Sequence, residues 1–127
     1  ERIYAISQMS SKVQANLNRD ELIRKRRENF TYLNNNLKSL DEQVFTLGQW
    51  NVPLYFPILV KERTSFQKHL VQNAIYAPVV WPKDGNQPQQ CEGAEKAYEH
   101  LLCIPIDQRY GLDDMERICN VINEYYK

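Results

Sequence analysis

The sequence predicts an α+β fold in which a small, largely antiparallel sheet carries helices packed on one of its faces. Three observations support this prediction. Apolar residues recur at helical spacing in two long stretches, one early and one at the end of the chain. Between them, short apolar runs alternate like strands and are interrupted by prolines. The order helix, strand, strand, helix, strand, short helix, strand, helix mixes hairpins with single-helix crossovers, which indicates an α+β sandwich.

The first long helix is expected to begin at Asp20, which is suited to an N-cap, and to end near Ser39. Its apolar residues keep largely to one face at spacings of three, four and seven: Leu22, Ile23, Phe30, Leu33, Leu37 and Leu40. The other face carries the run Arg24–Arg27. Because glutamates stand four residues away, we interpret this run as a solvated face whose charges pair along the helix.

Two strands are expected next, Val44–Leu47 and Val52–Val60, with a turn at Gly48 between them. Alternation in the second strand predicts a core face made of Val52, Leu54, Phe56, Ile58 and Val60. Proline donates no hydrogen bond to a neighbouring strand. Pro53 and Pro57 therefore favour an edge strand or a bulge.

A helix from Lys61 to Asn73 follows, and Asn73 is suited to a left-handed cap at its end. The apolar run AIYAPVVWP, residues Ala74–Pro82, then predicts a strand. Its inward side chains are Ile75, Ala77, Val79 and Trp81, and its outward ones are Tyr76, Pro78 and Val80. By this alternation Trp81 is first of all a core residue.

The rest of the chain predicts a loop, a short helix, a strand and a final helix. Lys83–Cys91 is a loop by composition, Gly93–His100 is the short helix, and Leu101–Ile106 is the strand. The final helix repeats apolar side chains at spacings of three and four, namely Met115, Ile118, Ile122 and Tyr125. Asp113 and Glu116 are expected to form a capping pair at its start.

Length and composition indicate one domain of 127 residues that needs neither metal nor disulfide to fold. Basic and acidic residues balance at 16 each, which argues against binding to nucleic acid or to an anionic membrane surface. The three cysteines have no paired spacing and predict free thiols in the cytoplasm. No apolar run approaches the length of a membrane span, and the start lacks the order of a signal peptide.

The first residue, Glu1, suggests that the chain was cut from something longer. Residues 1–18 have mixed periodicity and are assigned to a linker or to the end of a preceding large domain. Residues 19–127 are assigned to one C-terminal small α+β domain.

No complete catalytic, cofactor or metal site is predicted from the residues alone. His100, Cys103 and Cys119 lack the ligand number and spacing of a zinc site, and Cys103 is more simply a small buried hydrophobe. The acidic residues near position 114 are better explained as helix caps than as an acid/base pair. None of the four glycines stands at phosphate-loop spacing.

Four segments in order carry a family resemblance: ISQMSSKV, LIRKRRENFTYLNNNL, VPLYFPILV through IYAPVVWP, and LLCIPIDQRYGLDDMERICNVI. The second contains the pattern R-R-x-N-[FY]-x-x-L. The last combines a short L-x-x-P strand, a turn and a helix opened by acidic residues. Together they resemble the C-terminal part of the sugar aminotransferases of the DegT/DnrJ/EryC1/StrS family, which are pyridoxal-phosphate (PLP) enzymes of the aspartate-aminotransferase fold type.

The resemblance implies that the chain is the small domain of such an enzyme, which transfers an amino group to a keto or nucleotide-linked sugar. It implies that PLP and its Schiff-base lysine belong to a missing N-terminal large domain, and that the longer protein is a homodimer. No lysine of this chain stands in a cofactor-lysine context: Lys12, Lys25, Lys38, Lys61, Lys68, Lys83, Lys96 and Lys127. The chain alone is therefore expected to be inactive.

The family's small domain closes over the active site through the segment that matches Val79–Pro82. The resemblance thus implies a substrate entrance lined by Val80, Trp81, Pro82 and Gln90. Many members have histidine or a similar polar residue where this chain has Val80, and the segment ISQMSSKV lacks the asparagine and arginine found in many relatives. These departures indicate a divergent branch.

Two alternatives from other classes stay open on the sequence. The chain could be a free-standing ligand-binding or regulatory α+β module in which the loop after Trp81 forms a pocket rim. It could also be a protein-interaction scaffold that uses exposed tyrosine and tryptophan side chains.

Overall fold

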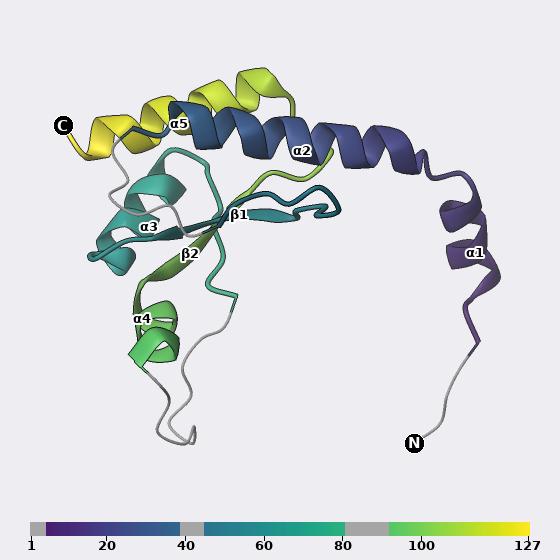
Figure 1. Ribbon diagram of the computed structural model, residues 1–127, viewed down its shortest axis with the longest axis horizontal. Helices are drawn as coiled ribbons and strands as arrows, with labels where there is room; N and C mark the ends of the chain where they lie inside the picture. The colour runs from purple at the N-terminus through teal and green to yellow at the C-terminus, as the bar shows by residue number, and fades with distance from the viewer. Residues whose placement is uncertain (1–4, 39–44, 81–91) are drawn as a thin grey trace.

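A computed structural model describes residues 5–38, 45–80 and 92–127, and in these ranges it forms five helices and a two-stranded antiparallel sheet (Figure 1). The elements in chain order are α1 (Gln8–Ala15), α2 (Arg19–Asn36), β1 (Tyr55–Leu59), α3 (Arg63–Gln72), α4 (Glu92–His100), β2 (Leu101–Pro105) and α5 (Leu112–Tyr125). The predicted α+β class is confirmed, with fewer strands than the sequence suggested.

α2 and α5 lie side by side above the sheet and run in the same direction (Figure 1). Each contributes one buried face, with Phe30 and Leu33 from α2 and with Met115, Ile118, Cys119 and Ile122 from α5. The Phe30 ring packs against Phe56 of β1 with 4.8 Å between ring centroids. The 3.6-residue repeat therefore predicted the core-facing side of both helices, except that Ile23 is 37% exposed. Leu40 lies outside the described residues.

The sheet pairs Phe56 with Ile104 and Ile58 with Leu102, and all four side chains are buried. β1 begins only at Tyr55, so the expected strand Val52–Val60 is shortened at its start. Val52 and Leu54, which were predicted to face the core, are 40% and 44% exposed.

Phe45–Leu47 is not a strand either, and Val44 lies outside the described residues. The stretch that follows it is tied to α2: the Arg27 guanidinium donates to the carbonyl oxygens of Gly48, Gln49 and Asn51 at 2.6–3.2 Å.

Several helix ends differ from the expectation because side-chain caps decide them. Asn18, not Asp20, is the N-cap of α2, and its Oδ1 accepts from the Glu21 amide at 3.2 Å. α2 ends at Asn36, since Leu37 is extended. α5 is capped by Asp114, whose carboxylate accepts from the Gly111 amide at 2.9 Å, and not by the pair Asp113 and Glu116.

α1 stands apart from this body (Figure 1) and buries none of its residues. It is nevertheless a complete helix, with Ser7 as N-cap and Asn16 as C-cap. Across the described ranges, none of the helices has the length and apolar character needed to cross a membrane.

Candidate functional site

The segment that follows α3 leads to the predicted substrate entrance. α3 ends in a Schellman motif: Ile75 N–H donates to Leu70 O at 2.8 Å, and Ala74 N–H donates to Val71 O at 2.9 Å. The left-handed residue in this motif is Ala74, with φ 55°, whereas Asn73 has φ −96°. The expected left-handed Asn73 is therefore wrong by one residue. The motif turns the chain sharply and buries Ile75 beside Leu70.

Two contacts hold the next residues along the sheet edge. Cys103 of β2 donates its amide to Pro78 O at 3.2 Å, and the Gln67 amide group of α3 donates to Ala77 O at 2.8 Å. β2 thus lies between β1 and this segment. Residues 75–80 do not form the predicted strand. Pro78 has no N–H to donate, and the Ala77 carbonyl oxygen accepts from the Gln67 side chain. The segment therefore does not form the regular backbone hydrogen bonds of a strand.

The inward and outward alternation of this segment is confirmed where it is described, except that Pro78, predicted to face outward, is half-buried. Ile75 and Ala77 are buried and Val79 packs against the core, while Tyr76 and Val80 are exposed. Val80 is 39% exposed. The other three predicted entrance residues, Trp81, Pro82 and Gln90, lie outside the described residues, as does the loop 83–91.

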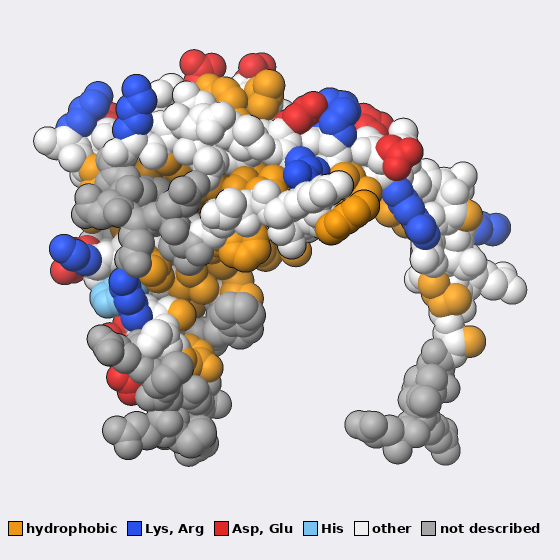
Figure 2. All heavy atoms as spheres, viewed as in Figure 1, with side chains coloured by type: hydrophobic (Ala, Val, Ile, Leu, Met, Phe, Trp, Pro, Cys, Tyr) orange, Lys and Arg blue, Asp and Glu red, His pale blue; other side chains and the backbone are white. Residues whose placement is uncertain are grey.

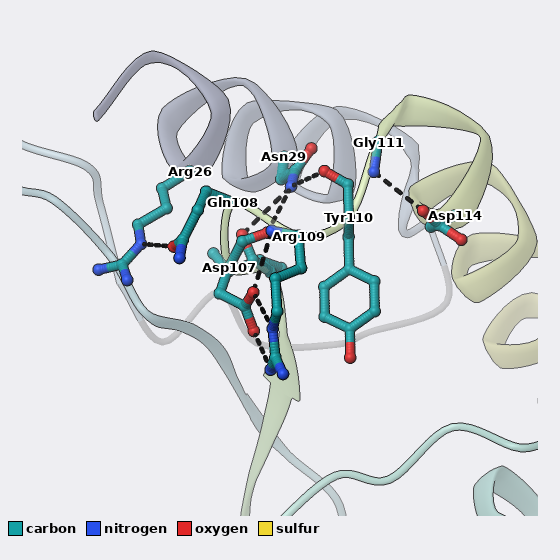
Figure 3. A network of polar contacts seen from close by, with 9 residues as sticks. Arg26, Asn29, Asp107, Gln108, Arg109, Tyr110, Gly111 and Asp114 are labelled. Carbon is teal, nitrogen blue, oxygen red and sulfur yellow. Dashed lines mark hydrogen bonds and ion pairs between the residues drawn. The ribbon is translucent and has the colours of Figure 1, made fainter. Parts of the chain in front are cut away.

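A polar network ties α2 to the turn between β2 and α5 (Figure 3). Asn29 is buried, and its Nδ2 donates to the carbonyl oxygens of Ile106, Asp107 and Tyr110 at 3.1–3.3 Å. Arg26 on the same helix donates through Nε to Gln108 Oε1 at 2.9 Å. Sequence reasoning treated the arginine run as a solvated face. That holds for Arg24, which pairs with Glu28 at 2.8 Å, but it is wrong for Arg26 and Arg27.

Asp107 is the buried carboxylate of this network. It accepts from Arg109 through Nε and a terminal nitrogen of the guanidinium, both at 2.8 Å, and from the Arg109 amide at 3.1 Å (Figure 3). These hydrogen bonds lower the pKa of Asp107 more than its burial raises it, and they raise the pKa of Arg109. A carboxylate with a lowered pKa and filled acceptor positions is a poor general base, so this network orders the turn.

The cysteine and histidine candidates show no reactive arrangement in the parts of the chain that are described. Cys103 and Cys119 are buried free thiols; burial raises the pKa of both, in the case of Cys119 to about 11, which keeps them protonated at neutral pH. His100 Nδ1 lies 3.1 Å from Val60 O. Among described residues no three His, Cys, Asp or Glu side chains come together as a metal site would require.

Comparison with protein families identifies the chain. The sequence pattern of the DegT/DnrJ/EryC1/StrS aminotransferase family matches residues 10–123. The chain belongs to this family. A search of curated proteins gave no match.

Solved aminotransferase structures share the fold. Sugar aminotransferase CalS13 from Micromonospora echinospora superposes with a TM-score of 0.77 at 23% identity, over 87% of this chain and 33% of that one. A DegT DnrJ EryC1 StrS aminotransferase from Brucella abortus gives 0.75 at 18%, over 92% and 34%. Aminotransferase TlmJ from Streptoalloteichus hindustanus gives 0.69 at 20%, over 83% and 32%. The chain spans about a third of the length of these structures.

Within the DegT/DnrJ/EryC1/StrS pattern, the R-R-x-N-[FY] motif has a structural explanation in this chain. Arg26 and Asn29 hold the β2–α5 turn, Arg27 holds the stretch before β1, and Phe30 packs against Phe56. Spacing along the helix could not reveal these partners, because they lie about 20 or about 80 residues away in sequence. The motif itself was the signal that could have pointed to them.

Proposed function

We propose that this chain is the C-terminal small domain of a PLP-dependent aminotransferase-like protein that transfers an amino group to a keto or nucleotide-linked sugar. The observation that carries the proposal is the family match over residues 10–123, combined with the coverage of only about a third of the solved aminotransferase chains. The reaction chemistry belongs to the cofactor, and a small domain contributes orientation and closure around the substrate.

The environment of the lysines supports placing the cofactor lysine in a separate large domain. A Schiff-base lysine is normally held in a site that desolvates its amine. Of the lysines that the structure describes, Lys25 is half-buried and the others are exposed. The proposed partners are therefore the missing N-terminal large domain and, as the family resemblance implies, a second subunit of the longer protein. The protonated free thiols support a cytoplasmic location.

The segment before residue 81 supports a substrate entrance near Val80. Gln67 and Cys103 fix the backbone at Ala77 and Pro78 on both sides, while the Val80 side chain is left partly exposed at its end. In the proposed function Val80, Trp81, Pro82 and Gln90 border the entrance and exclude water from the substrate. Val80 has no group that could move a proton, so it acts by shape.

The test is a cofactor-trapping experiment on the 127-residue chain. The chain is incubated with PLP and reduced with borohydride, and its peptides are analysed by mass spectrometry. We expect no stoichiometric adduct on any one lysine. The longer polypeptide encoded by the same reading frame serves as the positive control and is expected to carry one adduct outside this chain. A stoichiometric adduct on one lysine of the 127-residue chain would contradict the proposal.

A free-standing ligand-binding module is the second candidate function, and a surface groove favours it, at a different place from the pocket rim that the sequence predicted after Trp81. The groove has a volume of about 540 Å³ and is lined along α2 and at the start of α5 by polar and apolar side chains that include Arg24, Glu28, Tyr32 and Leu112. Calorimetry of the chain against amino acids and nucleotides separates the two functions. The small-domain proposal predicts no tight binding, and micromolar binding abolished by Arg24→Ala would favour the module.

A further inference from the structure

Two polar side chains of α3 bind backbone carbonyl groups in two separate parts of the chain. Arg63 donates through a terminal guanidinium nitrogen to Tyr98 O of α4 at 2.5 Å, and Gln67 donates to Ala77 O at 2.8 Å. The two side chains are four residues apart and therefore lie on one side of α3, one turn from each other. α3 thus contacts both α4 and the segment that leads to Val80.

The hydrogen bond from Gln67 holds the outer edge of the segment that follows α3. Successive carbonyl groups of an extended chain point to opposite sides. Pro78 O faces β2, where it accepts from the Cys103 N–H at 3.2 Å, so Ala77 O faces away from β2. On that side Gln67 supplies the donor that a neighbouring strand would otherwise give. The segment is therefore held by one backbone bond and one side-chain bond.

The hydrogen bond from Arg63 closes the end of α4. The last four carbonyl groups of a helix have no partner within it, and Tyr98 O is one of these. A guanidinium suits this place because its positive charge also lies at the negative end of the helix dipole. Beside it, Val60 N–H donates to His100 O at 3.0 Å, and His100 Nδ1 lies 3.1 Å from Val60 O. These contacts fix the end of α4 at the point where β2 begins.

α3 meets these two places through polar side chains, whereas its buried apolar side chains, Phe66 and Leu70, belong to the core. At the edge where α3 lies above α4, Figure 2 shows Lys or Arg side chains and a histidine, while hydrophobic side chains lie over the sheet. Apolar packing is not directional, but a hydrogen bond fixes both a distance and an angle. The two bonds from α3 therefore determine where the segment and the helix end lie.

We propose that Arg63 and Gln67 are positioning residues of the substrate entrance, which α3 holds in place from the segment before Val80 and from the end of α4. This rests on the proposed function, in which Val80 borders the entrance. Both side chains act through backbone carbonyl groups, and neither is placed in contact with the substrate. A displacement of about 1 Å away from the chemistry can cost a large factor in rate, so such bonds matter to the reaction as well as to stability.

The first test measures backbone amide exchange in the 127-residue chain by NMR. Gln67→Met keeps the length of the side chain and removes its donor. We expect the Cys103 amide, which bonds to the segment after α3, to exchange about 5- to 10-fold faster in this variant. Arg63→Met should accelerate the Val60 amide, which bonds to the end of α4, by a similar factor. Each variant should leave the other variant's reporter amide within about 2-fold of the wild type.

Two matched controls change exposed side chains on other sides of α3. Gln72→Met and Lys68→Met should leave both reporter amides within about 2-fold of the wild type. The buried residue Ile118 of α5 supplies an amide that reports on global unfolding. Equal acceleration of the Val60, Cys103 and Ile118 amides by Arg63→Met or Gln67→Met would mean that the side chain only adds stability, and it would overturn the proposal.

The second test uses the longer polypeptide and aminooxyacetate, a small carboxylate reagent that captures PLP as an oxime. We expect the second-order rate constant of capture to rise at least about 5-fold in Arg63→Met and Gln67→Met, because a loosened entrance admits the reagent more readily. Arg63→Lys keeps a charged donor for Tyr98 O and should stay within about 2-fold of the wild type, as should Gln72→Met. The PLP content of all the variants should equal that of the wild type.

This inference and the proposed function fail on different results. A longer polypeptide that carries no PLP overturns the proposed function, and the role of the entrance with it. Equal capture rates for the wild type, Arg63→Met and Gln67→Met, in a polypeptide that does carry PLP, overturn the positioning role alone and leave the proposed function in place.

Discussion

α1 and α2 are consecutive helices joined by only three residues, and they differ in how much of their surface is buried by the rest of the chain. α2 buries Asn29, Phe30 and Leu33, and arginines on its polar side reach distant parts of the chain. α1 buries none of its residues and leaves Met9 and Val13 exposed. The difference teaches that an amphipathic pattern marks a helix but does not say where its partner lies. For α2 the partner is within this chain, whereas α1 buries none of its side chains against the described residues.

The largest expected effect on the free energy of unfolding comes from comparing an alanine substitution in α2 with one in α1. Leu33→Ala removes a fully buried side chain of α2 and should lower the free energy of unfolding by about 3 kcal/mol. Val13→Ala removes an exposed side chain of α1 and should change it by less than about 0.5 kcal/mol. Urea unfolding of the 127-residue chain measures both. Comparable losses for the two variants would break the comparison.

Asn29→Ala sharpens the comparison by testing how α2 is tied to the body. It leaves three carbonyl oxygens around the β2–α5 turn without their common donor, so we expect a loss of about 2–3 kcal/mol. Asn35→Ala, at an exposed position of the same helix, is the control and should cost about 0.5 kcal/mol or less. Urea unfolding gives both values. If Asn29→Ala costs no more than the control, the network in Figure 3 does not anchor α2.

A smaller effect, with a pH signature, is expected from Asp107→Asn. The pKa of Asp107 is lower in the folded state, so its charged form stabilises the fold above pH about 4, and this contribution is lost as pH falls through the lowered pKa. Because Arg109 is 74% exposed, solvent weakens the pair and we expect a loss of about 1 kcal/mol at pH 7.

The measurement for Asp107→Asn is the urea midpoint at pH 7 and at pH 3, with Glu124→Gln as a control at an exposed carboxylate. The gap between wild type and Asp107→Asn should narrow at the lower pH. A gap that stays constant between the two pH values would show that the charge of Asp107 does not stabilise the turn.

The smallest effect is a stabilisation by Ala74→Gly. Ala74 has φ 55°, a conformation that costs a residue with a Cβ about 1–2 kcal/mol and that glycine adopts freely. Glycine also gains entropy in the unfolded state, so the net gain should be about 0.5 kcal/mol. Ala77→Gly, at a buried position with ordinary φ, should destabilise instead. Differential scanning calorimetry resolves the two signs, and a loss for Ala74→Gly would mean that the left-handed turn is not strained.

For the candidate substrate entrance, the residues alone predicted little more than which side chains of the segment after α3 point inward and which point outward. The pattern of Ile75, Ala77 and Val80 followed from side chains alternating along an extended chain, which is a local property. The hydrogen bond from the Gln67 side chain to the Ala77 carbonyl oxygen was not predictable from the sequence. Side-chain partners in different elements depend on how those elements pack. The family resemblance supplied the rest of the entrance, and Trp81, Pro82 and Gln90 stay predictions.

By itself the sequence determined the α+β class, the buried faces of α2 and α5, and the family, because periodicity and ordered motifs are written in neighbouring residues. Only the tertiary structure decided that Arg27 binds the carbonyl oxygens of Gly48, Gln49 and Asn51 before β1, that Asn29 anchors the turn that leads to α5, and that α1 buries none of its residues. Hydrogen bonds between residues far apart in sequence, and the presence or absence of a neighbour over an apolar face, are set by the packed chain as a whole.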